Sequence, residues 1–294
     1  MATRDLVGRI RRRPAAYLAA FVRRIYDLLV DRFARNDILT YASAIALQLL
    51  TALIPLALLA ALLLGAFSEQ SVWRMELAPR FASRSSVETY QAVDAVVEGL
   101  ISGRHTEWLV FATLIVIWEV SGAVRAVMGG LNRIFEREET RSIWRRFGLS
   151  FLLAIGVAVC TLGALVLISR GGGWVDWGAA QVLWALIRWT CVVALLWAAV
   201  AMLIRVAPNA HEPAGWVTLG STIVVVAWIG ASLVFGWWVT SVADYKTPFG
   251  TAIALLTLVG YLYTSAIVFL VGAQVDQLLI EQTNAKEKPL AGLL

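Results

Sequence analysis

The chain has 294 residues, of which 60% are hydrophobic and only 15% are charged, and its mean hydropathy is +0.74. A chain this apolar is not a pair of soluble domains, so we expect an all-α integral membrane protein. The net charge of +5 would suggest a nucleic-acid partner on a soluble chain. Arginines that face the cytoplasm beside anionic lipids explain it better here, so we expect membrane lipids and no nucleic acid as partners.

Residues suited to catalysis or metal binding are few. The two cysteines, Cys160 and Cys191, fall within apolar segments, where cysteine behaves as a small hydrophobic residue. The two histidines, His105 and His211, are far apart in the sequence. No phosphate-binding loop, zinc-protease motif, serine-hydrolase motif or paired metal-ligand spacing is present. We therefore expect no enzyme activity, no cofactor and no metal ion.

Residues 1–37 form an arginine-rich segment that we expect in the cytoplasm, in contact with anionic lipids of the inner leaflet. Within it, residues 17–34 place apolar side chains at helical spacing with charged side chains opposite, which predicts an amphipathic helix. A position on the membrane surface and a position packed under the helix bundle both agree with this pattern. The segment lacks the features of a cleaved signal peptide, so we expect none.

The transmembrane domain is predicted to cover residues 38–280. Its first span, 38–67, contains no charged residue over a length that exceeds the roughly 20 residues needed to cross the hydrocarbon. Five more apolar stretches follow, and each must be helical because a backbone in lipid has to satisfy its own hydrogen bonds. The six predicted transmembrane helices are residues 38–67, 108–128, 147–168, 183–206, 215–242 and 249–275.

The distribution of lysine and arginine predicts the orientation of these spans. Seventeen of these residues fall on the side of the N-terminal segment and six on the opposite side, with Arg125 and Arg188 inside spans. Positive residues favour the cytoplasm, so both termini, including the tail 281–294, are predicted to be cytoplasmic. An even number of spans agrees with this orientation.

The connection between the first two spans, residues 68–107, is long and acidic and is predicted to lie outside the cell. Its Val87, Tyr90, Val93 and Val97 recur at helical spacing, which predicts an amphipathic helix. A loop of this length is uncommon without a role of its own. We interpret it as a cap over the external face of the bundle.

Charged and polar residues inside the spans are candidates for a transport pathway, because charge in hydrocarbon is costly. Glu119 and Arg125 lie on the second span, about 9 Å apart along the helix axis and roughly 120° apart around it, so each needs a partner on another helix or water. For Glu119, a role in transport and a structural pairing are both open. Gln48 and Pro55 interrupt the first span, where the proline frees a carbonyl and either shapes the bundle or lines a pathway.

Two stripes of small and polar residues accompany these positions. The stripe on the second span consists of Trp118, Gly122, Arg125, Gly129, Asn132 and Glu136. The stripe on the sixth span consists of Gly250, Thr257, Tyr261, Thr264, Ser265, Gly272 and Asp276. Stripes of this kind either bring helices close together or line a wet cavity, and the pattern allows both interpretations.

Three stretches of the chain are distinctive when read together. The first span reads TYASAIALQLLTALIPLALLAALLL, the second span and its connection read WEVSGAVRAVMGGLNRIFEREETRSIWRRF, and the last two spans run from APNAHEPAGW to VGAQVDQ. They resemble the YihY/BrkB family of bacterial inner-membrane proteins, whose members once carried a mistaken ribonuclease BN label. The resemblance covers most of residues 30–280. It implies six helices with cytoplasmic termini, a transport or envelope role, and no agreed substrate or catalytic residues.

The chain departs from the family pattern at two positions. Members commonly carry Tyr-Gly where this chain has Phe249 and Gly250, and an acidic residue where it has Gln274. If that carboxylate couples transport to protons in other members, Asp276 or Glu119 takes its place here, or the coupling is absent.

We therefore expect a multi-pass protein of the bacterial inner membrane that moves a lipid-related or small amphiphilic substrate, as a transporter or flippase does. The alternative is a membrane scaffold without transport, which serves envelope integrity or virulence through its external loop. The ribonuclease label finds no support, because RNA hydrolysis calls for a soluble surface with metal ligands or a histidine pair. A homo-oligomer is compatible with the sequence.

Overall fold

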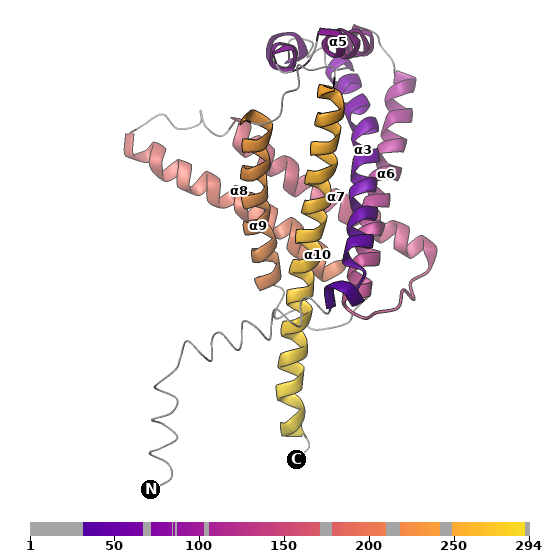
Figure 1. The fold of residues 1–294 in the computed structure, drawn as a ribbon, viewed down its shortest axis with the longest axis vertical. Coiled ribbons are helices and arrows are strands. Elements are labelled where there is room, and N and C mark those ends of the chain that lie inside the picture. The colour runs from indigo at the N-terminus through magenta and orange to yellow at the C-terminus, as the bar shows by residue number, and fades with distance from the viewer. Residues whose placement is uncertain are drawn as a thin grey trace.

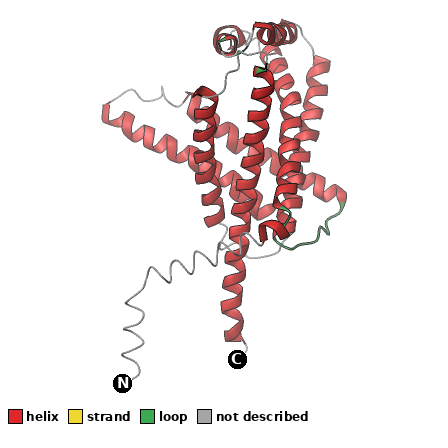
Figure 2. Ribbon diagram, in the orientation of Figure 1, coloured by secondary structure: helices red, strands yellow, loops and turns green. Residues whose placement is uncertain are grey.

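The computed structural model describes residues 32–66, 72–83, 85, 87–102, 106–170, 178–209, 218–241 and 249–291. Within these ranges the regular structure is helical, and Figure 2 shows no strand in the part of the chain that is described. The amphipathic helix predicted over residues 17–34 lies outside the described residues except at its end. The same holds for most of the N-terminal arginines that we expect to touch lipid.

Six of the helices are long and apolar enough to cross a membrane. They are α3 (Ile38–Ala66), α6 (Thr106–Ile134), α7 (Ile143–Arg170), α8 (Gly178–Val206), α9 (Thr218–Ser241) and α10 (Gly250–Ala291). Each overlaps one of the predicted spans, which confirms the all-α membrane protein with six transmembrane helices. α10 is longer than its predicted span, because it continues past residue 275 and through most of the predicted tail.

The six long helices form a closed ring in which each contacts the next. α3 packs against α6 and α10, and the ring continues from α6 through α7, α8 and α9 back to α10. α10 also reaches across to α6. In Figure 1, α3, α9 and α10 stand nearly upright, while α7 and α8 cross the view obliquely behind them.

A cap of short helices lies across one end of the ring (Figure 1). It consists of the π-helical turn η1 (Val72–Leu77), α4 (Ala78–Ala82) and α5 (Val87–Ser102). Trp73, Ala78 and Ile101 form a small core of their own, and the indole N–H of Trp73 donates a 2.9 Å hydrogen bond to Asp94 of α5. The amphipathic helix predicted in the long connection is therefore confirmed, with its apolar face against η1 and α4.

The main hydrophobic core lies at the other end of the ring. We call this the arginine-rich end, because Arg32, Arg133, Arg141 and Arg146 lie there, and we call the capped end the α5 end. The core is built from the start of α3, the end of α6, the start of α7, the end of α8, the start of α9 and the middle of α10. The largest side chains that are fully buried in it are Ile38, Met128, Leu131, Ile134, Val200, Ile204, Val224 and Leu270.

Toward the α5 end the ring is packed less tightly. There α7 and α8 contact each other, and Gly163 of α7 lies against Leu195 of α8. The described residues of α7 after Ala154, and those of α8 before Val200, add no buried residue to the main core. Figure 1 shows the first half of α8 leaning away from the upright helices. The bundle is therefore a wedge that is closed at the arginine-rich end and wider at the α5 end.

α9 and α10 approach each other closely where two glycines meet. A Cβ added to Gly220 would lie 2.5 Å from the carboxyl carbon of Asp276, and one added to Gly272 would lie 2.9 Å from the carbonyl oxygen of Gly220. Both positions therefore need glycine. The close approach lets the fully buried Asp276 accept a 2.7 Å hydrogen bond from the N–H of Gly220. Because Gly220 lies in the first turn of α9, Asp276 caps that helix from a different helix.

Replacing Gly220 by alanine should destabilise the protein, because the added carbon forces α9 away from α10. We expect a loss of about 1–3 kcal/mol, as for other overpacked sites, measured as a lower thermal midpoint in detergent by tryptophan fluorescence. The control is Gly230→Ala on the same helix, where no atom lies within 4 Å of the added carbon. That variant should match or exceed the wild type, since alanine favours the helix. Equal loss in both variants would contradict a tight crossing.

Candidate functional site

A cavity of about 710 Å³ lies under the cap, between α9 and α10 at the α5 end. Its volume falls within the range of about 300–1,000 Å³ that is typical of small-molecule sites. Much of its wall is apolar, with Phe81 from the cap, Phe235 and Val239 from α9, and Leu258 from α10. The hydroxyl groups in the wall belong to Ser85, Thr89, Ser232, Thr240, Thr257 and Tyr261. Among the described residues that line this cavity, none is charged.

Two of the residues predicted from the sequence, Thr257 and Tyr261, lie in this wall. The hydroxyl groups of Tyr261 and Ser232 are 2.9 Å apart and join α10 to α9, and the Tyr261 ring meets Phe235 edge to face at 5.2 Å. Thr257 also lines a smaller cavity of about 350 Å³, together with Trp238 of α9. An apolar space with neutral hydroxyl groups suits an amphiphile better than an ion, which would need charged or carbonyl ligands.

Glu119 lies at the middle of α6 and is bound by α3. The hydroxyl group of Thr51 donates a 2.9 Å hydrogen bond to the Glu119 carboxylate, and lies 3.1 Å from the carbonyl oxygen of Gln48. Pro55, which lies one turn later in α3, has no N–H to bond the carbonyl of Thr51. The Thr51 hydroxyl therefore links two of the predicted residues, Gln48 and Glu119, one turn before Pro55 in α3.

Arg125 faces α7 instead. Its guanidinium group lies 4.1 Å from the centre of the Phe147 ring and 5.7 Å from that of Trp118, and it donates a hydrogen bond to Ser121. Ser121 in turn is 2.7 Å from the hydroxyl of Ser150 on α7. Glu119 and Arg125 thus make their contacts with different helices, and no ion pair joins them in the described structure.

The lower part of the predicted α10 stripe is packed inside the bundle. Gln274 and Asp276 are 1% and 0% exposed. One carboxylate oxygen of Asp276 accepts a hydrogen bond from the backbone N–H of Gly220. Its other oxygen is buried without a hydrogen-bond partner among the described groups. The α10 stripe therefore has two parts: a cavity wall at Thr257 and Tyr261, and a tight helix contact at Gly272 and Asp276.

The stripe predicted on the second span is divided in a similar way. Gly122 lies against Gln48 and Gly129 against Tyr41, both on α3, whereas Arg125 lies against α7. The glycines of this stripe bring α6 and α3 together, and its polar residues serve other contacts.

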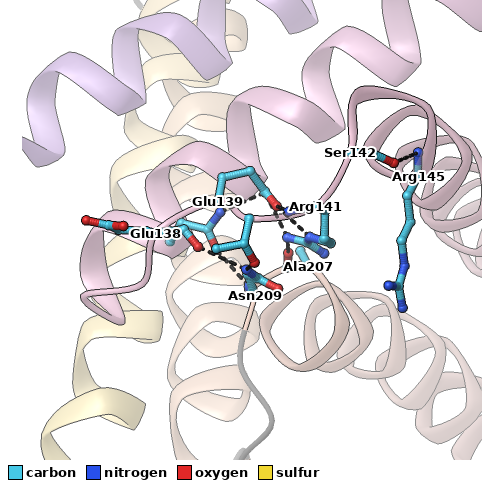
Figure 3. Close-up of polar contacts among 9 residues, drawn as sticks. Glu138, Glu139, Arg141, Ser142, Arg145, Ala207 and Asn209 are labelled. Carbon is cyan, nitrogen blue, oxygen red and sulfur yellow. Dashed lines mark hydrogen bonds and ion pairs between the residues drawn. The ribbon is translucent and has the colours of Figure 1, made fainter.

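A polar network joins the α6–α7 connection to the end of α8, and Figure 3 shows Glu139, Arg141 and Asn209 within it. Asn132 belongs to this network. The side-chain amide of Asn132 donates from its nitrogen to the Glu139 carboxylate at 3.0 Å. Its side-chain oxygen accepts a hydrogen bond from the backbone N–H of Asn209 at 2.8 Å. The Asn209 side chain donates to the backbone carbonyl of Glu138 and to the hydroxyl of Thr140. Both asparagines therefore bond across the gap between two connections that are far apart in the sequence.

Arg141 completes this network. Its guanidinium donates to both carboxylate oxygens of Glu139, at 2.7 and 2.9 Å, and to the backbone carbonyl of Ala207 at 2.9 Å. This bidentate ion pair is largely buried, and the hydrogen bond from Arg141 lowers the pKa of Glu139 from its ordinary value of 4.5. We call Asn132, Glu139, Arg141 and Asn209 the polar clamp.

The end of α6 directs the chain into the clamp. The N–H of Arg137 bonds the carbonyl of Asn132 and the N–H of Glu136 bonds that of Arg133, which is the pattern of a Schellman turn. Glu136 occupies the left-handed position of this turn, with φ of 51°, where glycine is usual. The turn stops the helix at Ile134 and sends the chain toward α8.

Sequence reasoning singled out Asn132 but missed Glu139, Arg141 and Asn209 as its partners. They stand in segments that are distinctive in the sequence, FEREETR and APNA. Their pairing depends on how α6 and α8 end side by side, which no local pattern expresses. Among the described residues, no group of three or more His, Cys, Asp or Glu side chains is placed to hold a metal ion.

Comparison with known proteins identifies relatives of this chain. The family model described as virulence factor BrkB matches residues 29–292. The ribonuclease-like protein YfkH from Bacillus subtilis (strain 168) is 26% identical over 197 residues, which cover 64% of this chain and 71% of that protein. No solved structure matches. Both polar clamp segments lie within the region that the family model covers.

Glu139→Gln should weaken the clamp, because it removes the charge that holds Arg141. The folded-state pKa of Glu139 is below its ordinary value of 4.5, so its contribution is present above that pH and is lost as pH falls through the folded-state pKa. The free energy of unfolding, followed through thermal midpoints in detergent, should fall by about 1.5–3 kcal/mol at pH 7. This difference from the wild type should shrink below pH 4.5. Glu138→Gln is the matched control, since only the backbone of Glu138 joins the network. Equal midpoints for Glu139→Gln and wild type at pH 7 would refute the clamp.

Proposed function

Because the chain belongs to the BrkB virulence factor family, we propose that it is a transporter or flippase-like protein of the bacterial inner membrane. Its substrate is a lipid-related or small amphiphilic molecule. The observation that carries this proposal is the cavity under the cap, which joins an apolar wall to six hydroxyl groups and has no charged side chain among its described lining residues. A site of this chemistry accepts an acyl chain together with an uncharged polar group.

The wedge shape of the bundle supports the same proposal. The main core holds the helices together at the arginine-rich end, while the first half of α8 leans away from the upright helices (Figure 1). A bundle that is tight at one end and loose at the other provides a path for a substrate to enter from one side of the membrane. The broken ladder of α3 beside Glu119 lies halfway along that path, where transporters commonly place polar groups.

We further propose that the arginine-rich end faces the cytoplasm, with both termini on that side. Arg133, Arg137, Arg141, Arg145 and Arg146 fall in or beside a single short connection there, as the positive-inside rule requires. The cavity then belongs to the outer half of the membrane.

The relative YfkH has ribonuclease-like in its name. For this chain we propose transport and no enzyme activity, because the polar groups that the structure brings together are a structural clamp and a cavity wall of hydroxyls. A scaffold that works through its external cap is the competing proposal, and the experiments below separate the two.

Ala254→Trp should obstruct the cavity, because Ala254 lines it from α10. In liposomes that contain the purified protein, transbilayer movement of fluorescent lipids with neutral and charged headgroups should slow several-fold in this variant. Ala252→Trp is the control, since Ala252 is exposed on the same helix and is not part of the wall. If no lipid in the panel moves faster than in protein-free liposomes, the scaffold replaces the transporter as the proposed function.

Glu119→Gln tests the mid-membrane carboxylate. Glutamine keeps an oxygen that accepts the hydrogen bond from Thr51 but removes the charge. Lipid movement in the same liposomes should fall, while the thermal midpoint in detergent stays near that of the wild type. Movement at the wild-type rate would assign Glu119 a structural role only.

A further inference from the structure

Two arginines, Arg125 of α6 and Arg146 of α7, lie close together where α6 meets α7 at the arginine-rich end. The guanidinium of Arg125 lies over the Phe147 ring of α7, and Arg146, which precedes that phenylalanine, is close enough for the two positive charges to repel each other. Arg145 is exposed one residue earlier. Figure 3 shows its side chain lying apart from the polar clamp. Its backbone N–H donates a hydrogen bond to the hydroxyl of Ser142.

None of these three arginines has an acidic partner within the described part of the chain. Arg125 contacts a serine hydroxyl and two aromatic rings, all of them neutral. The Nε atom of Arg146 is buried and has no hydrogen-bond partner among the described groups. Two arginines at the same end are paired with carboxylates, Arg32 with Glu281 and Arg141 with Glu139.

Arginine side chains that have no acidic partner favour the binding of an anion. Burying part of a guanidinium without a counter-ion costs free energy, and the positive end of the α7 helix dipole adds to the local potential. The arginine fork matches a phosphate group in both shape and charge. A phosphate that bridges the guanidinium groups of Arg125 and Arg146 would remove their repulsion.

The position of the group favours a lipid as the source of that phosphate. Phe147 is four residues from the start of α7, so the Arg125 guanidinium lies about 6 Å from the end of that helix, near the level of lipid headgroups. Trp144, which lies three residues before Phe147 on α7, is 86% exposed, as aromatic residues at the edge of a membrane are. Trp118, which packs beside the Phe147 ring, is 62% exposed, so this part of the α6–α7 contact borders lipid.

We propose that Arg125 and Arg146 together bind the phosphate group of an anionic phospholipid. This site lies on other helices than the cavity and at the opposite end of the bundle, so it does not depend on the proposed transport function. It also differs from the general attraction of lipids to the N-terminal arginines, because it is formed by two membrane helices.

Native mass spectrometry of the purified protein in detergent tests the proposal. The probes are phosphatidylglycerol and phosphatidylcholine with the same acyl chains, and inorganic phosphate alone. Wild-type protein should prefer phosphatidylglycerol, and Arg125→Gln and Arg146→Gln should each weaken its binding about fivefold. Arg133→Gln is the control, because Arg133 lies at the same end but pairs with Asp37. It should leave the binding nearly unchanged.

Arg125→Lys provides a second variant in case the glutamine variants fold poorly. Lysine keeps the positive charge but lacks the planar, forked guanidinium group. This variant should therefore retain part of the preference for phosphatidylglycerol, while its size-exclusion profile stays like that of the wild type. The same preference in Arg125→Gln and Arg146→Gln as in the wild type would overturn the proposal. Arginine-dependent binding of inorganic phosphate, without any preference for phosphatidylglycerol, would overturn the lipid as its source.

Discussion

The bundle depends on the fact that lipid offers no hydrophobic force to press helices together. Apolar side chains gain little by leaving hydrocarbon for one another, so membrane helices are held by close backbone packing and by polar bonds. In this protein both kinds of contact lie at the arginine-rich end. Gly220 and Gly272 let α9 and α10 touch, and the polar clamp ties the end of α6 to the end of α8. Most of the deeply buried side chains follow from these contacts.

Because the tight helix contacts lie at one end of the bundle, the helices leave room for a cavity at the other end. At the α5 end, helix contacts are replaced by a cavity, and the cap supplies part of its wall instead of a tight seal. The hydroxyl bridge from Ser232 to Tyr261 is a weak tie between α9 and α10 compared with the glycine crossing below it. The tight helix contacts and the cavity therefore lie in different halves of the same helices.

The sequence predicts those features that depend on local composition and misses those that depend on pairing. The six spans and the helix of the cap follow from apolar length and from spacing, and the structure agrees with them. The residues of one predicted stripe do not share one neighbour, because Gly122 lies against Gln48 of α3 and Arg125 against Phe147 of α7. The capping of α9 by Asp276 and the partners of Asn132 required the tertiary arrangement, because each joins residues far apart in the chain. The roles assigned to Glu119, Gln48 and Pro55 stay predictions, although the Thr51 hydroxyl links Glu119 to Gln48.

α10 has a mechanical property that follows from its length. It is a single helix of 42 residues, about 63 Å long, whose upper part borders the cavity and whose lower part is gripped at Gly272 and at Glu281. A stiff rod held part-way along its length is a lever, and the glycine crossing is its fulcrum. A tilt of about 10° at that point would carry the far end through about 5 Å. Because Arg32 holds Glu281, such a swing would also pull on the segment that leads into α3, and it would couple the width of the cavity to the arginine-rich end of the bundle.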